Sequence, residues 1–301
     1  MTLISPRNIL NRHKIRPSKG LGQNFLIDKS VLKKIIGAAD IKPSDFIIEV
    51  GPGLGVLTQA LAKQAKTVIA VEKDPKMCEI LKETLKDYKN IKIINDDVLK
   101  TRLACEPQPR RERSSSAGVK NYKVVANLPY YITSPVIRKF LESERQPELM
   151  VLMVQKEVGQ RICSSPPKMN LLAVSVQFYA NPEIIDYVKK QSFWPQPKVD
   201  SAILKILAFV QRKYPAFNQR FFRIVKAGFS QPRKQIASNF MKKLALSSPK
   251  GLALSLSKGV KLNKNQIINW LALNKINPTQ RAESLDIKDW INLTETFPIK
   301  N

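Results

Sequence analysis

Short apolar runs alternate with stretches of helical period over the first half of the chain. The runs are apolar on both faces, as is typical of parallel strands covered by helices. They lie at residues 46–50, 67–72, 91–94, 122–126 and 149–154. Stretches of helical period lie at residues 29–39, 56–65, 75–85 and 134–141, the first with Asp28 as a suitable N-cap. This alternation predicts an α/β fold, with a mostly parallel, Rossmann-like sheet and helices on both faces.

Helical patterns follow residue 154, and the character of the chain changes after residues 203–210. Helices are predicted at residues 217–229, 234–244, 263–273 and 287–293, with a Ser/Gly/Lys-rich connection near 247–259. Residues 103–120 are polar and rich in proline and serine, and are expected to form a mobile insertion. We therefore predict a basic leader at 1–27, an α/β domain at 28–210 and a small all-α domain at 211–301, with the boundary near 209–214.

The charge is strongly positive and unevenly distributed. The 301 residues carry a formal net charge of +27, and residues 201–282 contain sixteen basic residues and no acidic one. A long region of one sign repels itself, and a polyanionic partner is the simplest compensation. Nucleic acid is the commonest such partner, although charge does not distinguish RNA from DNA. Generic solubility charge and adhesion to anionic lipid are the alternatives.

Composition excludes several other classes. No uncharged apolar run reaches the roughly 18 residues of a membrane helix, and residues 1–10 lack the apolar core of a signal peptide. Three scattered cysteines and a single histidine, His13, argue against a disulfide framework, a metal site and a Ser-His-Asp triad. His13 is expected at the surface of the leader. A reducing cytoplasm is the predicted compartment, with no membrane association.

A glycine-rich turn follows the first predicted strand of the sheet, within Glu49-Val50-Gly51-Pro52-Gly53-Leu54-Gly55. Glycines let a backbone turn tightly and approach a ligand closely. A dinucleotide fingerprint has its third glycine three residues after the second, where this chain has Val56. The spacing favours S-adenosylmethionine, which has no pyrophosphate to bind. Glu72 and Asp97 follow the next two strands, suitably placed to accept hydrogen bonds from ribose hydroxyls and an adenine amine.

The fourth predicted strand leads into Asn127-Leu128-Pro129-Tyr130, at the edge where doubly wound sheets bind ligands. The exocyclic amine of adenine is a poor nucleophile because its lone pair is delocalised. The Asn127 side-chain oxygen and the Pro129 carbonyl could accept both N–H groups and let that nitrogen pyramidalise. Tyr130 offers a ring for base stacking. Together with the glycine-rich turn, this favours methyl transfer by positioning, without a metal, over an ordinary Asn-Pro turn.

Six segments, in order along the chain, resemble motifs of the ribosomal RNA adenine N6-dimethyltransferase family (the KsgA type). They are Gly22-Gln23-Asn24-Phe25-Leu26, Glu49-Val50-Gly51-Pro52-Gly53, Asn127-Leu128-Pro129-Tyr130-Tyr131, Gln155-Lys156-Glu157-Val158, Pro195-Gln196-Pro197-Lys198-Val199-Asp200-Ser201 and Arg281-Ala282-Glu283. The resemblance implies dimethylation of two adjacent adenosines in a hairpin near the 3′ end of small-subunit (16S) rRNA, with S-adenosylmethionine as donor. It also implies a role in 30S ribosome biogenesis and a monomeric protein.

The resemblance also implies roles for individual residues. Cofactor contacts are expected at Asn24, Leu26, Gly51, Gly53, Glu72, Asp97 and Asn127. The target base is expected against Asn127, Leu128, Pro129 and Tyr130, with Phe193 as a second stacking ring. Residues 23–26 become a lid over the cofactor. RNA binding is expected at Arg16, Lys19, Arg220, Arg223, Arg233 and Lys234, because a basic second domain can grip the RNA backbone.

The chain departs from the family pattern away from the catalytic turn. Pro232 stands where the family more often has Arg, and Met169-Asn170 where Tyr-Gly is usual. Three alternatives stay open: an Erm-type large-subunit rRNA methyltransferase, an assembly factor that mainly binds 30S precursors, and a DNA adenine methyltransferase. The segments 199–202 and 281–283 favour the small-subunit enzyme over the Erm type.

Overall fold

The computed structural model describes residues 6–18, 20–101, 122–209, 215–244 and 262–298. The predicted insertion at 103–120, the connection at 247–259 and Lys19 lie outside the described residues. The chain forms two compact units, one of residues 1–160 and 179–209 and the other of residues 161–178 and 210–301. Residues 161–178 group with the C-terminal helices, whereas the sequence places them in the first domain.

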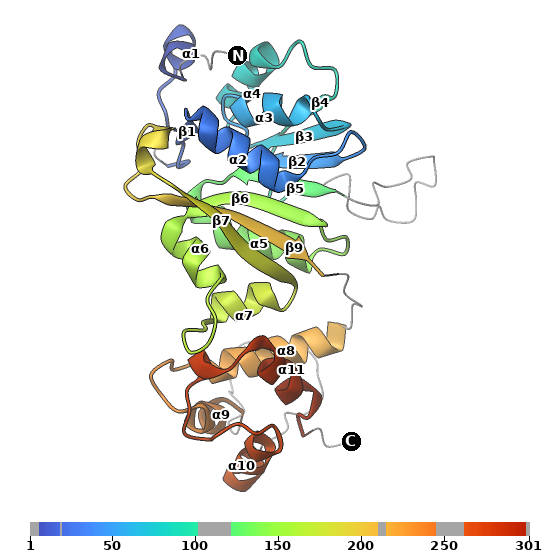
Figure 1. Cartoon of the computed structure of the whole chain (residues 1–301), viewed down its shortest axis with the longest axis vertical. Helices are drawn as coiled ribbons and strands as arrows, with labels where there is room; N and C mark the ends of the chain where they lie inside the picture. The colour runs from blue at the N-terminus through green and yellow to red at the C-terminus, as the bar shows by residue number, and fades with distance from the viewer. Residues whose placement is uncertain (1–5, 19, 102–121, 210–214, 245–261, 299–301) are drawn as a thin grey trace. The chain divides into compact units, whose positions relative to one another are not determined.

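A seven-stranded sheet forms the centre of the first unit, in the order β4-β3-β2-β5-β6-β9-β7 (Figure 1). The first five strands are mutually parallel: β4 (Ile91–Asn95), β3 (Thr67–Glu72), β2 (Phe46–Val50), β5 (Lys123–Asn127) and β6 (Leu149–Gln155). β9 (Ser201–Ala208) is antiparallel to β6 and to β7 (Ala180–Val188). The predicted Rossmann-like, mostly parallel sheet is confirmed.

Helices between the strands bury their apolar faces on this sheet. They are α2 (Lys29–Ala39), α3 (Val56–Ala62), α4 (Pro75–Thr84), α5 (Thr133–Glu142) and α6 (Lys156–Ile162). The Asp28 side chain caps α2 as predicted, accepting from the Ser30 and Val31 N–H groups. Apolar residues of α2 and α3 share one core cluster with those of β2, β3, β5, β6 and β9. Among the described residues, no helix combines the length and apolar character that crossing a bilayer requires.

The expectation of helical patterns after residue 154 is wrong for residues 180–188, which form β7. β7 is the edge strand of the sheet; only its end residues, Ala180 and Val188, are buried, and the residues between them alternate between exposed and half-buried positions. It contains Pro182, and a register shift lies between Ile184 and Asp186. Proline and irregular pairing are tolerated at sheet edges, so this strand lacks the continuous apolar run of the central strands.

Two short strands connect the leader to the proline-rich segment. β1 (Phe25–Leu26) pairs antiparallel with β8 (Phe193–Trp194), so that Leu26 lies opposite Phe193. The leader helix α1 (Pro6–Arg12) buries Ile9 and Leu10 in a cluster with Phe25 and with residues of α4. The predicted lid is therefore anchored on both sides by buried apolar contacts.

The second unit is all helical in its described part, as predicted. Its helices are α7 (Leu171–Gln177), α8 (Pro215–Gly228), α9 (Ile236–Leu244), α10 (Lys264–Leu273) and α11 (Ile287–Glu295). Phe178, after α7, stacks on Phe221 of α8 with ring centroids 3.9 Å apart. The Trp290 ring of α11 packs so closely on Gly228 that an added Cβ would lie 2.4 Å from it. Aromatic side chains thus join these helices through a core of their own.

Candidate active site

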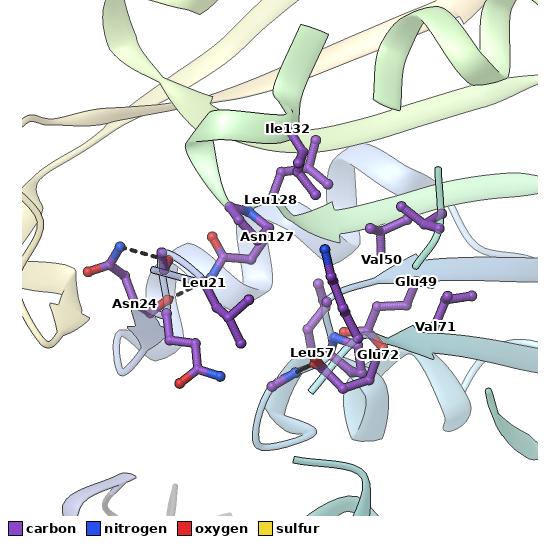
Figure 2. Close-up of a pocket in the computed structure, with 18 of the residues that line it drawn as sticks. Leu21, Asn24, Glu49, Val50, Leu57, Val71, Glu72, Asn127, Leu128 and Ile132 are labelled. Carbon is purple, nitrogen blue, oxygen red and sulfur yellow. Dashed lines mark hydrogen bonds between the residues drawn. The ribbon is translucent and has the colours of Figure 1, made fainter. Parts of the chain in front are cut away.

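A pocket opens at the carboxyl ends of the parallel strands, where doubly wound sheets bind ligands (Figure 2). Its walls come from the leader, the glycine-rich turn, the ends of β3 and β4, and the turn after β5. The lining residues are 21–26, 49–54, 56–57, 71–73, 96–98 and 127–132. In Figure 2, Asn24 and Asn127 come together on one side and Glu49 and Glu72 on the other.

The pocket gathers nearly all of the predicted cofactor and base residues. Those that line it are Asn24, Leu26, Gly51, Gly53, Glu72, Asp97, Asn127, Leu128, Pro129 and Tyr130. Phe193 does not: its side chain is 3% exposed and belongs to the core cluster that contains Leu26. In this structure its ring is therefore not available for stacking. Of the predicted RNA-binding residues, Arg16, Arg223, Arg233 and Lys234 are exposed and Arg220 is half-buried.

The glycine-rich turn needs its glycines for conformation and for space. Gly51 and Gly53 adopt φ values of +67° and +57°, a region that L side chains rarely enter. A Cβ on Gly53 would lie 3.1 Å from the Phe25 ring, and one on Gly51 would lie 3.6 Å from Pro129. The turn is thus packed between β1 and the turn after β5, which leaves its backbone facing the pocket.

Glu72 is a buried carboxylate at the end of β3. Its Oε2 accepts a hydrogen bond from the Gly53 N–H at 3.3 Å, and its Oε1 accepts from the Asp74 N–H at 2.8 Å. Burial raises its pKa. Each carboxylate oxygen has a second lone pair, so both can also accept from a ligand hydroxyl. Glu72 therefore fixes the glycine-rich turn and keeps acceptor capacity toward the pocket.

Asp97 lies at the rim, after β4. Its Oδ1 accepts from the Leu99 N–H at 3.0 Å, and its Oδ2 lies 3.1 Å from the Lys73 ammonium. The hydrogen bond from the Leu99 N–H lowers the pKa of Asp97 most, and the nearby Lys73 ammonium lowers it further. Asp97 is therefore an ionised acceptor at the position predicted to face an adenine amine.

Asn127 joins the lid to the turn after β5. Its Nδ2 donates to the Asn24 carbonyl oxygen at 3.0 Å, while the Asn24 Nδ2 donates to the Gly22 carbonyl at 3.1 Å (Figure 2). The first bond orients the Asn127 amide and commits its N–H₂ group to the lid. The Oδ1 atom is then the part of this side chain that can accept from a substrate.

The next residues of this turn are fixed as well. The Pro129 carbonyl accepts from the Ile132 N–H at 3.1 Å, which leaves one lone pair for a substrate N–H. The Tyr130 hydroxyl lies 2.7 Å from the Oγ of Ser201, a fully buried residue at the start of β9. Burial raises the pKa of Tyr130. The ring of Tyr130 is thus held at its hydroxyl end by the neighbouring strand.

Removing the Tyr130 ring is expected to cost much more than removing its hydroxyl. Base stacking is worth ~1–3 kcal/mol, so Tyr130→Ala should lower kcat/KM by roughly 10- to 100-fold. Tyr130→Phe and Ser201→Ala should each lower it only a few-fold, because each removes only the bond that orients the ring. The double variant should match the single ones, since they act on one bond. A Phe variant as impaired as Ala would assign the main role to the hydroxyl.

Glu49 is a pocket residue to which the sequence assigned no role of its own. Its side chain is 1% exposed, and its Oε2 has no hydrogen-bond partner among the described residues. Burial raises its pKa to about 8, and the nearby Glu72 carboxylate adds to the rise. Glu49 is therefore largely protonated at neutral pH and carries an O–H donor beside Glu72. A strand-end glutamate was visible in the sequence, but its burial was not.

The raised pKa of Glu49 predicts a pH-dependent stability. The folded protein holds this proton up to about pH 8, whereas the unfolded chain releases it near 4.5, so the folded state binds more protons in between. The stabilising contribution of Glu49 to the free energy of unfolding is fully present below pH 4.5 and is lost as the pH rises through 8. From pH 5.5 to 8 the wild type should lose roughly 1–3 kcal/mol of unfolding free energy relative to Glu49→Gln. Urea unfolding at several pH values measures these free energies. Parallel pH profiles for the wild type and Glu49→Gln would contradict the prediction.

Comparisons with known proteins identify the family of this chain. A family model described as ribosomal RNA adenine dimethylase matches residues 12–297. A "Ribosomal RNA small subunit methyltransferase A" of Dehalococcoides mccartyi (strain ATCC BAA-2266 / KCTC 15142 / 195) is 42% identical, covering 94% of this chain and 89% of its own length. One of the same name from Alkaliphilus metalliredigens is 39% identical, covering 97% of each chain.

Solved structures show the same fold. A dimethyladenosine transferase from Plasmodium falciparum superimposes with a TM-score of 0.66 at 27% identity, covering 89% of this chain and 95% of its own. The 23S rRNA methyltransferase ErmE gives a TM-score of 0.68 at 24% identity, covering 91% of this chain and 99% of its own, a likeness of fold alone. With the family model matching from the leader to the last helix, the chain belongs to the ribosomal RNA adenine dimethylase family.

Proposed function

We propose that this protein dimethylates N6 of two adjacent adenosines in a hairpin near the 3′ end of small-subunit rRNA, with S-adenosylmethionine as methyl donor. The observation that carries the proposal is that the turn from Asn127 and the wall formed by Glu72 and the glycine-rich turn line opposite sides of the same pocket. Relatives about 40% identical over nearly the whole chain carry the small-subunit name, which favours this substrate over large-subunit rRNA.

The residues present fit S-adenosylmethionine. Buried Glu72 has acceptor capacity for ribose hydroxyls, Asp97 is an ionised acceptor for an adenine amine, and Gly51 and Gly53 leave backbone without side chains along the pocket. Leu26 adds an apolar wall from the lid. When bound, this cofactor supplies an electrophilic methyl group on a sulfonium centre.

The turn after β5 would position the target base. Asn127 Oδ1 would accept from one N–H of the adenine amine, and the Pro129 carbonyl would accept from the other. The bond to Asn24 keeps the Asn127 amide in one orientation before the substrate arrives. The Tyr130 ring receives the extruded base, which offsets part of the few kcal/mol that unstacking costs. The rate gain comes from orientation, and no general base is needed within the pocket.

The helical unit would bind the RNA backbone through its basic residues. Arg223 of α8 and Arg233 and Lys234 before α9 are exposed, as phosphate contacts must be. The double variant Arg233→Gln/Lys234→Gln should weaken binding to small-subunit particles and lower the slope of log affinity against log salt by about 1 to 2. Equilibrium binding over a range of salt concentrations measures this slope. An unchanged slope would show that these two residues do not contact the RNA backbone.

Methylation of separated ribosomal particles tests the proposed function. Unmethylated 30S particles, 50S particles and duplex DNA are incubated separately with labelled S-adenosylmethionine, and methylated nucleosides are identified by mass spectrometry. N6,N6-dimethyladenosine at two adjacent positions of the small-subunit rRNA is expected. Label that enters only the 50S rRNA would establish the Erm-type alternative. Tight 30S binding without any methylation would establish the assembly-factor alternative. Label that enters duplex DNA would establish the DNA methyltransferase alternative.

A further inference from the structure

A second pocket of the first unit is lined by residues 155–157, 160, 190 and 198–200. It adjoins the start of β9, where Ser201 bonds the Tyr130 hydroxyl. Asp200 lines this pocket, and the next residue, Ser201, bonds the Tyr130 hydroxyl. Gln155, also in the lining, pairs with Ser201 across β6 and β9. The pocket is therefore next to the hydroxyl end of the Tyr130 ring.

Asp200 holds three chain segments together around this pocket. Its carbonyl oxygen accepts from the Lys156 N–H at 3.0 Å, where α6 begins. Its side-chain Oδ1 accepts from the Lys190 N–H at 3.0 Å. Lys198 precedes Asp200 by two residues in the proline-rich segment. Three lysines from three separate segments are thus brought to one polar pocket.

The charges of the pocket leave an excess of ammonium groups. Asp200 is already engaged, by the Lys190 N–H and by the Lys189 ammonium at 3.7 Å. Glu157 is the other carboxylate of the lining. Among the described residues, no carboxylate pairs with the ammonium groups of Lys190 and Lys198, and that of Lys156 lies 5.0 Å from the centroid of the Tyr187 ring. An anionic ligand would complete this arrangement.

We propose that this pocket binds the phosphodiester backbone of the RNA strand beside the adenosine that stacks on Tyr130. The proposal rests on the proposed function. An extruded base stays covalently joined to a phosphate on each side, so a base on Tyr130 brings its flanking phosphates close to the ring. Lysine ammonium groups are suited to such phosphates as compact point charges. Asp200–Ser201 then places the phosphate pocket and the stacking ring in one rigid unit.

This pocket also explains how one site can serve two adjacent adenosines. Phosphate contacts position a strand without reading its bases. A strand gripped through its backbone can therefore move by one nucleotide and present the neighbouring adenosine with equivalent contacts. Neutralising the three lysines should impair both methylation steps alike.

The test compares two triple variants with the same change in charge. The pocket variant is Lys156→Gln/Lys190→Gln/Lys198→Gln, and Lys198→Gln alone is the milder version. The control is Lys86→Gln/Lys89→Gln/Lys92→Gln, three exposed lysines at or before β4, the opposite edge of the sheet from β7. For binding to unmethylated 30S particles, the pocket variant should lower the salt slope by about 0.7 to 1.4 more than the control, which corresponds to one or two phosphates.

Phosphate-ethylation interference then locates the contacts. With the wild type and the control, ethylation of phosphates that flank the two target adenosines should block binding, and the pocket variant should lose this interference selectively. Equal salt slopes and equal interference in both triple variants would overturn the proposal. So would weaker binding with interference at the target unchanged, which would assign the lysines to another component of the particle. Wild type that does not methylate 30S particles would instead refute the proposed function.

Discussion

Replacing Asn127 with alanine is expected to lower methyl transfer by about 10³-fold, while 30S binding stays within a few-fold of the wild type. Removing a preorganised hydrogen-bonding partner at a reacting centre typically costs 10²–10³-fold, and Asn127 also supplies the bond that joins the turn to the lid. Single-turnover methylation of 30S particles measures the loss. Binding is expected to persist because the phosphate contacts lie elsewhere.

Two further variants separate the roles of Asn127. Asn127→Asp keeps an acceptor but loses the N–H₂ group that bonds Asn24, so it should retain more activity than alanine if the acceptor is the main role. Asn181→Ala, an exposed residue of β7 in the same unit, is the control and should behave as the wild type. Full activity of Asn127→Ala would show that the acceptor role is wrong.

The central strands were predictable because they carry their own signal. Strands buried on both faces are continuously apolar, and Gly51-Pro52-Gly53 and the turn from Asn127 follow two of them directly. The carboxyl ends of parallel strands meet at one edge, so these motifs were expected to share a pocket, and they do. β7 was missed because it contains Pro182, which sheet edges tolerate, and because adjacent Ile184 and Ile185 break the alternation of polar and apolar residues.

The features that could not be predicted depend on contacts between distant parts of the chain. Phe193 is buried because β8 pairs with β1 and places its ring in the core with Leu26, a pairing of two-residue strands without a periodicity to read. The bond from Ser201 to Tyr130 joins residues of different strands and motifs. The raised pKa of Glu49 likewise follows from burial beside Glu72 and not from its place in the motif.

Glu72→Ala is expected to weaken S-adenosylmethionine binding by about 10²-fold or more. A hydrogen bond to a charged group contributes ~1.5–3 kcal/mol, and the carboxylate is placed to accept from ribose hydroxyls. The same change removes the acceptors of the Gly53 and Asp74 N–H groups, which loosens the glycine-rich turn. Isothermal titration with S-adenosylmethionine measures the dissociation constant. Glu79→Gln, which removes an exposed charge from α4, is the control and should leave it unchanged.

A cofactor analogue without ribose hydroxyls separates direct recognition from loosening of the turn. If Glu72 binds the ribose, the wild type should bind 2′,3′-dideoxy-S-adenosylhomocysteine weakly, and Glu72→Ala should cost far less with this analogue than with S-adenosylhomocysteine. Equal losses for the two ligands would mean that Glu72 acts only by fixing Gly53. The wild type is also expected to bind the cofactor less tightly as the pH falls through the raised pKa of Glu72, because the protonated carboxyl accepts fewer hydrogen bonds. This pH dependence should be absent from Glu72→Ala, because alanine has no titratable side chain. If the variant kept the dependence, another group would be its cause.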